Sequence, residues 1–248
     1  MNPQDSQIHF CAVTFALLIA RNDIGRAASR LRGVTVDRPG PGEELNTGGA
    51  VTVPRQAATV IVLRGGADAL EVLLVQRNPE ARFMGGAWVF PGGAVDATEG
   101  EGDDAHRAAA VRELAEEAAI EDVDPASLVR FSRWITPAQV KVRFDTHFFL
   151  VAAPEDCEPR VDGAECVDLA WLTPQAALEG HRDGRLLLVF PTIRHLEQLS
   201  AFPNADAVLA HARGREVRPV EPRVVLGGEH ARIVLPGEPG YEDAATGA

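Results

Sequence analysis

Residues 107–120 read R-A-A-A-V-R-E-L-A-E-E-A-A-I, and this stretch decides how the rest of the chain is interpreted. It is rich in Ala and lacks Gly and Pro, so intrinsic propensity predicts one helix. Four apolar residues recur with the i, i+3, i+4, i+7 spacing of a buried helix face: Val111, Leu114, Ala115 and Ala118. Three acids recur at i, i+3 and i+4 and are expected on the opposite face: Glu113, Glu116 and Glu117.

Three glutamates on one helical face allow two interpretations. On a solvated surface, each like-charged pair costs only about 0.2–0.5 kcal/mol, so an acidic face in water is tolerated. In a cleft, two charges about 5 Å apart repel by roughly 3 kcal/mol at an effective dielectric constant of about 20, so three carboxylates need a cation to stay ionised. Hard divalent ions such as Mg²⁺ take oxygen ligands of this kind. The helix alone leaves both interpretations open.

The charge balance of the chain excludes some partners. Its 248 residues are enough for one elaborated domain, or for one domain with extensions. The chain has 24 Lys and Arg residues against 36 Asp and Glu residues, a net charge of −12. A general binder of nucleic acid or of anionic membranes needs a basic surface, so we expect neither partner. A small anionic ligand is still compatible, because a metal ion and local arginines can supply positive charge.

Cysteine usage and the N-terminal sequence indicate a reducing, cytoplasmic setting. The three cysteines form no C-x-x-C pair, so neither a disulfide framework nor a zinc site is expected. The apolar run over residues 11–20 is too short to cross a membrane. A signal peptide requires positive charge before such a run, and no Lys or Arg precedes this one. We therefore expect a cytoplasmic protein that is not inserted in a membrane.

Turn-forming residues and apolar periodicity divide the chain into three parts: residues 1–52 as an extension and linker, residues 53–200 as the main domain, and residues 201–248 as a C-terminal helix, hairpin and tail. Strands are expected at residues 57–63, 70–75, 87–90, 128–135, 142–151 and 165–172. Further helices are expected at residues 174–179, after an N-cap at Thr173, and at 191–199 and 205–213. A late hairpin is expected at residues 223–226 and 231–235.

A strand that ends in Gly92-Gly93, an acidic loop and the helix together form a more specific pattern than any one of them. This order resembles the signature of the Nudix hydrolase family, G-x5-E-x7-R-E-U-x-E-E-x-G-U, where U is a bulky aliphatic residue. The chain matches it at Gly93, Glu99, Arg112, Glu113, Leu114, Glu116, Glu117 and Ile120. The resemblance covers roughly residues 57–179. It implies an α/β fold of the Nudix type, an α/β/α sandwich with a mixed central sheet.

The chain departs from the signature at two places. Twelve residues separate Glu99 from Arg112 where the family has seven, so the loop carries five extra residues. Counting back seven from Arg112 instead gives Asp104 the place of the first acid, and both assignments stay open. The second departure is Ala119, where the family has Gly. It is expected to alter the turn after the helix more than the metal site, because Ala119 carries no ligand.

The resemblance implies metal-dependent hydrolysis of a diphosphate that is linked to another group. Glu116 and Glu117 would be the main ligands of Mg²⁺ or Mn²⁺. Glu113 would be a further ligand, or the base that takes a proton from the attacking water. Arg112 would orient these glutamates through charge-assisted hydrogen bonds rather than touch the substrate.

Two glycines and a late glutamate complete the implied site. The backbone carbonyl of Gly92 would add a metal ligand, and Gly93 would let the backbone approach the substrate because glycine has no side chain in the way. Many family members carry a further metal-binding glutamate a few residues before a tryptophan, and Glu165, six residues before Trp171, matches that place. Glu165 is equally well interpreted as an acid at the edge of a strand.

The sequence upstream of the glycines resembles a narrower subgroup, the coenzyme A diphosphatases, with the pattern L-L-T-x-R-(S/A)-x3-R-x3-G-x3-F-P-G-G. Residues 73–93 keep this spacing, with Val75 in place of Thr and Asn78 in place of Ser or Ala. The resemblance implies that Arg77 and Arg82 bind substrate phosphates, as paired arginines can. The long loop before the helix is similar to that of the peroxisomal-type acyl-CoA diphosphatases. The alternative is that both arginines pair with nearby acids.

These resemblances imply a metal-dependent hydrolase that splits coenzyme A or an acyl-CoA into a 3′,5′-ADP part and a phosphopantetheine part. One alternative is a diphosphatase for ADP-ribose, NADH or another nucleoside diphosphate derivative. Another is a module that senses a nucleotide without turnover, which the presence of all three helix glutamates argues against. The expected partner is a small nucleotide diphosphate, and the additions at both ends are of a kind often used to form a homodimer. His147 is predicted to be a surface residue rather than a catalyst.

Overall fold

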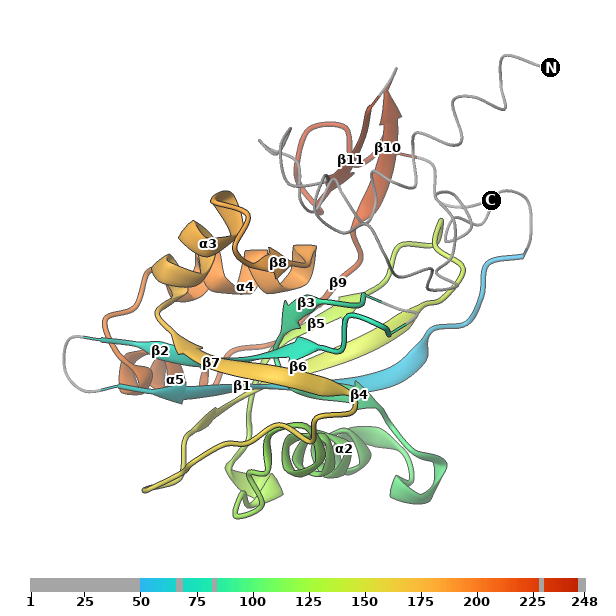
Figure 1. Ribbon diagram of the computed structural model, residues 1–248. Helices are drawn as coiled ribbons and strands as arrows, with labels where there is room; N and C mark the ends of the chain where they lie inside the picture. The colour runs from blue at the N-terminus through green and yellow to red at the C-terminus, as the bar shows by residue number, and fades with distance from the viewer. Residues whose placement is uncertain (1–49, 66–68, 82–83, 228–229, 245–248) are drawn as a thin grey trace.

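The computed structural model describes residues 50–65, 69–81, 84–227 and 230–244, so nearly all of the expected N-terminal extension lies outside the described residues. Within these ranges, nine strands form one sheet with the main order β8-β3-β2-β1-β6-β5-β9, while β4 pairs with β1 and β7 pairs with β2 (Figure 1). The strands are β1 (Arg55–Arg64), β2 (Glu71–Arg77), β3 (Ala87–Val89), β4 (Gly92–Ala94), β5 (Val129–Ile135), β6 (Phe144–Ala152), β7 (Cys166–Leu172), β8 (Leu187–Leu188) and β9 (Pro219–Val220).

The sheet is mixed, as predicted. β1 and β6 run parallel along the whole of their contact, from the pair Arg55 and Phe144 to the pair Leu63 and Ala152. The pairs β3–β8 and β5–β9 are also parallel, and the other described pairs are antiparallel. β1 and β2, both predicted as strands, pair antiparallel as a hairpin. Because β4 pairs with β1 rather than β3, the two glycines of β4 lie beside the middle of the domain.

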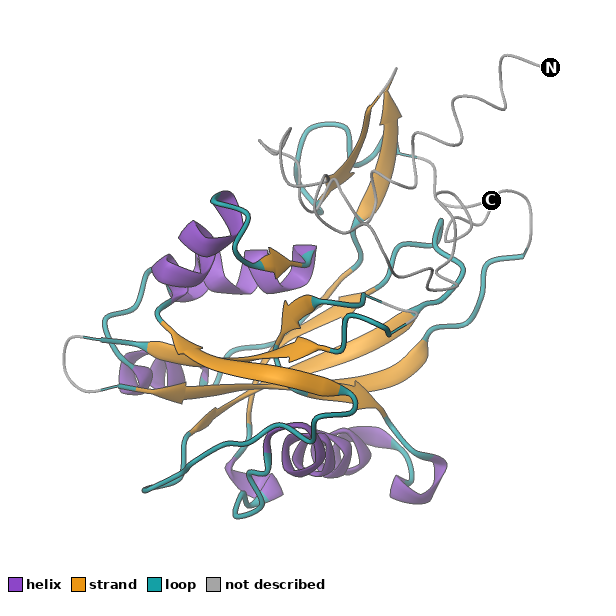
Figure 2. Cartoon of the chain, in the orientation of Figure 1, coloured by secondary structure: helices purple, strands orange, loops and turns teal. Residues whose placement is uncertain are grey.

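Helices cover both faces of the sheet and give three layers (Figure 2). The helices are α2 (Gly102–Ala118) on one face, and α3 (Pro174–Arg182), α4 (Phe190–Leu199) and α5 (Ala205–Ala212) on the other. Side chains of a strand alternate between the faces. In β1, Val60 and Val62 enter the core under α2, which we call the α2-side core, while Ile61 and Leu63 enter the α4-side core. The predicted α/β/α sandwich is confirmed.

The central helix differs from its prediction in its start and in its faces. α2 begins at Gly102, five residues early, because Asp103 and Asp104 occupy its first turn, where acids favour the helix dipole. Its buried face holds Leu114 and also Glu113 and Glu117, so the prediction of three glutamates opposite the apolar stripe was wrong. For Glu113 the cause lies in the neighbouring strand, since Gly93 of β4 leaves room for its carboxylate. The N–H of Gly92 in turn donates to the carboxylate of Glu117.

The helix ends in a left-handed residue without a glycine. Ala119 has φ 53° and ψ 35°, and its N–H donates to the carbonyl of Ala115 over 3.0 Å. The N–H of Ile120 donates to the carbonyl of Leu114 over 3.4 Å, which completes a helix-ending turn. A side chain in this region costs about 1–2 kcal/mol per residue, a cost that glycine avoids. The turn that the family builds with Gly is therefore kept here under strain.

Replacing Ala119 with Gly is expected to stabilise the protein by about 0.5–1 kcal/mol, because relief of the left-handed backbone outweighs the extra freedom glycine gives the unfolded chain. The free energy of unfolding in urea measures the effect. Ala108→Gly, in the middle of the same helix, is the matched control and is expected to destabilise by about 1 kcal/mol. If both substitutions destabilise equally, the backbone at Ala119 is not strained.

The remaining predicted elements are present with shifted ends. Thr173 caps α3 by accepting from the N–H of Ala176, as predicted. The late hairpin is formed by β10 (Arg223–Gly227) and β11 (His230–Val234). The strands β8 and β9 are absent from the sequence prediction, since two residues are too few to show a period. No helix in the described ranges is both long and apolar enough to cross a membrane.

A histidine occupies the centre of the α4-side core. His195, on α4, is 1% exposed, and its Nε2 lies 2.6 Å from the hydroxyl of Ser132. Four aromatic rings surround it: Phe90, Phe131, Trp134 and Phe148. Burial lowers the pKa of His195 to about 3, so its ring is neutral in the folded protein at neutral pH.

This histidine is expected to make the fold sensitive to acid. Its pKa is lower in the folded than in the unfolded chain, where it is about 6.5, so only the unfolded chain takes up the proton between these values. Stability should therefore fall as the pH drops from about 6.5 towards 3, by up to roughly 5 kcal/mol. The non-titrating variant His195→Gln should flatten this loss in urea unfolding curves at about pH 7 and pH 4. An unchanged acid dependence in the variant would rule His195 out as the cause.

Candidate active site

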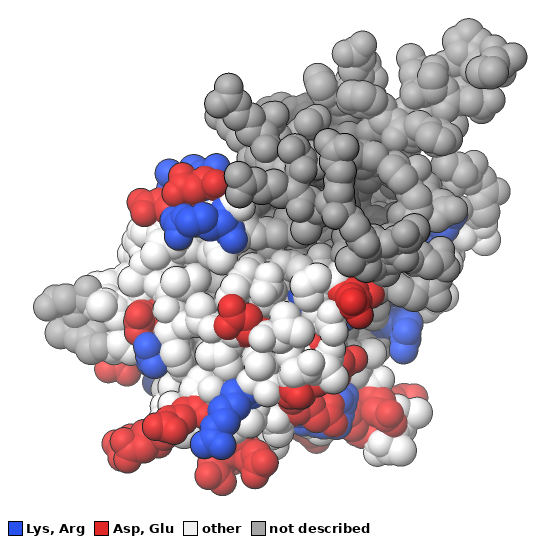
Figure 3. Space-filling model, in the orientation of Figure 1, with Lys and Arg blue, Asp and Glu red and all other residues white. Residues whose placement is uncertain are grey.

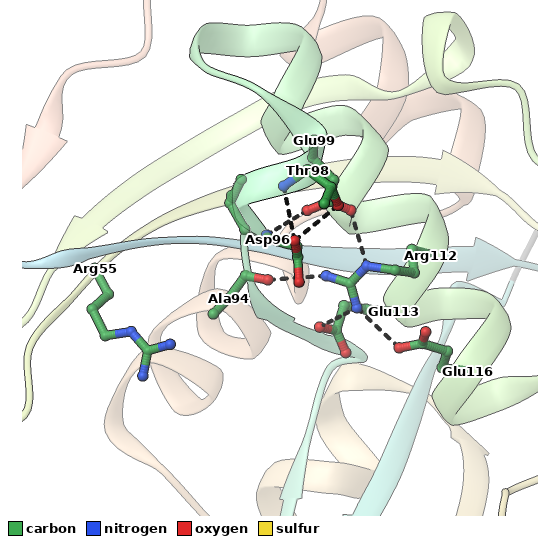
Figure 4. A pocket seen from close by; sticks show the side chains of 9 residues that line it. Arg55, Ala94, Asp96, Thr98, Glu99, Arg112, Glu113 and Glu116 are labelled. Carbon is green, nitrogen blue, oxygen red and sulfur yellow. Dashed lines mark hydrogen bonds and ion pairs between the residues drawn. The ribbon is translucent and has the colours of Figure 1, made fainter.

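Arg112 stands at the centre of the site, on the middle of α2. Its guanidinium donates to Glu99 Oε1 over 2.9 Å, to Glu113 Oε1 over 2.8 Å and to Glu116 Oε2 over 2.9 Å. A fourth bond joins Nη2 to the carbonyl of Ala94 over 3.0 Å (Figure 4). The bond to Glu99 and those to the other two acids raise the pKa of Arg112 above its ordinary value. One cation thus ties α2 to β4 and to the loop between them.

The structure places Glu99, not Asp104, beside Arg112. Glu99 ends a 3₁₀ turn, η1 (Ala97–Glu99), and its Oε2 accepts from the N–H of Asp96 over 2.6 Å. Asp96 in turn accepts from the N–H of Thr98, so the two acids form a capping box. Asp104 is exposed in the first turn of α2. The five extra residues therefore belong to the start of α2. Glu99, the acid found by counting forward from Gly93, is the one that contacts Arg112.

Glu113 lies against the backbone of β4. Its side chain is 11% exposed, and a Cβ atom on Gly93 would stand only 2.2 Å from Glu113 Oε1. A residue with a side chain at position 93 would therefore displace this carboxylate. Burial raises the pKa of Glu113, while Arg112 opposes that effect. Among the described residues, Arg112 is the cation that forms an ion pair with Glu113. It holds the charged carboxylate in place.

Glu117 is the most deeply buried acid of the site, with 2% exposure. The N–H of Gly92 donates to its Oε2 over 2.9 Å, and Cys166 is a neighbour that acts to lower the pKa of the carboxyl group. Nη1 of Arg77 lies 4.0 Å from its Oε1. Burial nevertheless raises the pKa of Glu117 to about 7, because these contacts only partly replace water. Glu117 is therefore a carboxyl group whose charge needs a further cation.

Glu116 differs from the other two helix acids in its exposure. Its side chain is 59% exposed and is held only at the surface by Arg112. The three glutamates offer hard oxygen donors of the kind that Mg²⁺ and Mn²⁺ accept, so they fit such an ion in chemistry. In the described part of the chain, no three potential ligands already converge on one point. Arg112 holds the carboxylates of Glu113 and Glu116 in ion pairs. Because the Glu116 side chain is exposed, it is the one with room to leave Arg112 for a metal ion.

The other predicted site residues lie around this cluster. Arg77, at the end of β2, pairs in register with Cys166 of β7, which brings its guanidinium to Glu117. Glu165 is exposed just before β7, and its charge contributes to the raised pKa of Glu113, so it lies on the same side of the domain. Arg82 lies outside the described residues.

A cavity of about 390 Å³ opens beside the Arg112 cluster. Acids dominate its walls: Asp96, Glu99, Glu113 and Glu116. Acidic side chains also gather along the side of the surface where α2 lies (Figure 3). An anion entering this cavity therefore meets a negative field unless cations accompany it or line the wall.

Sequence reasoning missed several residues of the site. The D-x-x-E spacing of Asp96 and Glu99 is the signal of a capping box and could have singled out Glu99. Cys166 carried no such signal, because its contact with Glu117 depends on the register of β7 on β2. His147, predicted at the surface, is half-buried, and its ring stacks on buried His106 with centroids 3.9 Å apart.

Known proteins share this fold and this site region. The NUDIX-domain family model matches residues 53–189, more than half of the chain. A Caenorhabditis elegans protein provisionally named nudix hydrolase 7 is 28% identical over 233 residues, 79% of this chain and 77% of the relative. The crystal structure of a NUDIX hydrolase from Alicyclobacillus acidocaldarius is 31% identical, with a TM-score of 0.57 over 65% of this chain and 97% of its own. The family match ends at Val189, so α4, α5 and the late hairpin lie beyond it.

Proposed function

Because this chain belongs to the Nudix family of hydrolases, we propose that it cleaves the diphosphate of coenzyme A or an acyl-CoA. The products are 3′,5′-ADP and a phosphopantetheine or its acyl derivative. The observation that supports this substrate is the matched spacing of residues 73–93. It is joined by the position of Arg77, whose Nη1 lies 4.0 Å from Glu117 Oε1. We likewise propose residues 53–200 as the catalytic domain.

We assign the metal site to the acids around β4. Glu116 and Glu117 are the proposed main ligands, with Glu113, the carbonyl of Gly92 and Glu165 as the further candidates. A bound Mg²⁺ or Mn²⁺ would neutralise the diphosphate and lower the pKa of the attacking water. The raised pKa of Glu117 supports the assignment, since a buried carboxyl group of this kind gains most from a cation.

Glu113 is the residue to which we assign the proton of the attacking water. Its Oε1 accepts from Arg112, which leaves Oε2 for the proton. Burial raises the pKa of Glu113, and a carboxylate with a raised pKa is a stronger base near neutral pH. The water oxygen forms a bond to one phosphorus of the diphosphate, and the bridging P–O bond breaks. Arg112 keeps Glu113 in place through this step, as a positioning residue.

We propose separate roles for Arg77 and Arg82. Arg77 is proposed to contact the diphosphate itself rather than a distant 3′-phosphate, because its guanidinium lies beside Glu117. A guanidinium there can bind two phosphate oxygens at once. Arg82 stays a proposed phosphate contact. Gly93 is proposed as a substrate contact through its backbone, since Glu113 fills the space that a side chain would take.

A substrate panel tests the proposal. The protein is incubated with Mg²⁺ or Mn²⁺ and coenzyme A, an acyl-CoA, ADP-ribose or NADH, and the products are separated by chromatography. Cleavage of coenzyme A or acyl-CoA with the highest kcat/KM is the expected result. Preference for ADP-ribose or NADH would replace the substrate assignment with the second candidate. Failure to cleave any of the four would overturn the enzyme assignment in favour of a sensing module, which the three retained glutamates argue against.

A further inference from the structure

Arg55 lines the cavity but forms no resolved ion pair with the acids in its wall. Arg55, the first residue of β1, shares the cavity wall with Glu113 and Glu116. Figure 4 shows it apart from the Arg112 cluster, with Ala94 between the two arginines. Arg112 cannot take its place as an anion-binding group, because its guanidinium already donates to four acceptors.

The charge of Arg55 is not neutralised within the part of the chain that the structure describes. The ion pairs resolved there include one at the other end of the same strand, between Arg64 and Glu71 at 2.8 Å, and none at Arg55. The guanidinium of Arg55 instead stands 5.9 Å from the centre of the Phe144 ring. It therefore keeps its hydrogen-bond donors for a ligand in the cavity.

The backbone fixes where Arg55 can act. Its N–H donates to the carbonyl of Arg143 over 2.9 Å, so the start of β1 is anchored. Strand alternation places Arg55 on the same face of the sheet as Ala57, which pairs with Ala94. Glu113 lies against Gly93, the neighbour of Ala94, and lines the same cavity as Arg55. Figure 4 shows Ala94 between Arg55 and the Arg112 cluster, so a ligand in this cavity reaches Arg55 with one anionic group and the acid cluster with another.

We propose that Arg55 binds a phosphate of the substrate that lies outside the scissile diphosphate. In coenzyme A this is the 3′-phosphate, so the inference rests on the proposed function and assigns a residue that sets its specificity. A guanidinium forms bidentate, charge-assisted bonds to a phosphate, and it would offset the acids that line this cavity.

Product binding tests the proposal independently of turnover. The dissociation constants of 3′,5′-ADP and of 5′-AMP, which differ by one phosphate, are measured by calorimetry on the full chain. Arg55→Ala is expected to weaken 3′,5′-ADP by about tenfold or more and 5′-AMP by less than about twofold. Arg55→Lys should recover part of the loss, because it keeps the charge but not the planar fork. Arg64→Ala, on the same strand, is the control and should change neither constant.

The outcomes separate this inference from the proposed function. If wild-type protein fails to bind 3′,5′-ADP more tightly than 5′-AMP, or if Arg55→Ala weakens both equally, the inference is overturned. Failure to cleave any diphosphate overturns the proposed reaction, while a selective loss of 3′,5′-ADP binding still supports the phosphate contact. With active enzyme, the same variant should raise KM for coenzyme A with kcat unchanged, and should leave KM for ADP-ribose as it was.

Discussion

Glu117→Gln is expected to lower kcat by roughly 1,000-fold or more while the fold stays intact. Glu117 is a proposed metal ligand, and loss of such a carboxylate removes several kcal/mol of transition-state stabilisation, where each 1.4 kcal/mol or so is a factor of ten in rate. The glutamine oxygen can still accept from the N–H of Gly92, so the local geometry is preserved. Turnover of coenzyme A with saturating Mn²⁺ measures the effect.

The same substitution is expected to stabilise the protein above neutral pH. The pKa of Glu117 is about 7 when folded and about 4.3 when unfolded, so between these values the folded chain holds a proton that the unfolded chain has released. Stability contributed by this group is therefore lost as the pH rises from about 4.3 to 7. Glutamine carries no such cost, so the variant should gain on the order of 2–3 kcal/mol at about pH 8 and little at about pH 4.

Glu121→Gln is the control for both effects, because Glu121 is an exposed acid just beyond the same helix. Its activity and stability should match those of the wild type within about 0.5 kcal/mol. If Glu117→Gln kept full activity, the assignment of Glu117 to the metal would be wrong. If Glu117→Gln lost activity but also lost stability at about pH 8, the charge of the buried Glu117 carboxylate would not destabilise the folded protein as inferred.

Arg112→Ala is expected to lose activity by about 100-fold or more and, in contrast to Glu117→Gln, to lose stability. The substitution leaves Glu113 buried without its cation, and breaking a pair of this kind costs about 3–5 kcal/mol when fully buried. Because the Arg112 side chain is 33% exposed, we expect about 2–3 kcal/mol in urea unfolding at about pH 8. Arg112→Lys should recover little, since one ammonium group cannot reach four acceptors.

Arg185→Ala is the matched control, because Arg185 pairs with Asp183 on the surface with 66% exposure. Its cost should stay below about 1 kcal/mol. Arg112→Ala should also regain part of its lost stability at about pH 4, because burial raises the pKa of Glu113 and protonation removes its unpaired charge. A stability loss that is equal at about pH 8 and pH 4 would show that Arg112 acts through packing rather than through its charge.

The sequence was sufficient for the order of the elements around the site. The hairpin of β1 and β2, the two glycines and α2 each follow from a period or a turn residue that needs no tertiary contact. The burial of Glu113 and Glu117 was not predictable in this way. Periodicity assigns charged residues to the solvated face. The burial of Glu113 depends on Gly93 of β4, which leaves room for its carboxylate, and Glu117 is met by the N–H of Gly92 in the same strand.

Two further differences have local physical causes. The choice between Glu99 and Asp104 needed the start of the helix, because α2 extends back to Gly102 and turns the extra loop residues into a helical turn. Ala119 was expected to alter the turn after the helix, yet the left-handed turn is retained and its cost is borne by the backbone. In both cases a few hydrogen bonds at a helix end decide the outcome.

Binding of Mn²⁺ to the full chain tests the central claim most directly, namely that the acids of α2 hold the catalytic cation. The fraction of free ion can be followed by electron paramagnetic resonance while Mn²⁺ is titrated into wild type, Glu117→Gln and Glu121→Gln. We expect wild type and Glu121→Gln to bind with the same affinity, and Glu117→Gln to bind at least about tenfold more weakly. Equal affinity in all three proteins would contradict the account, because the ion would then be held elsewhere.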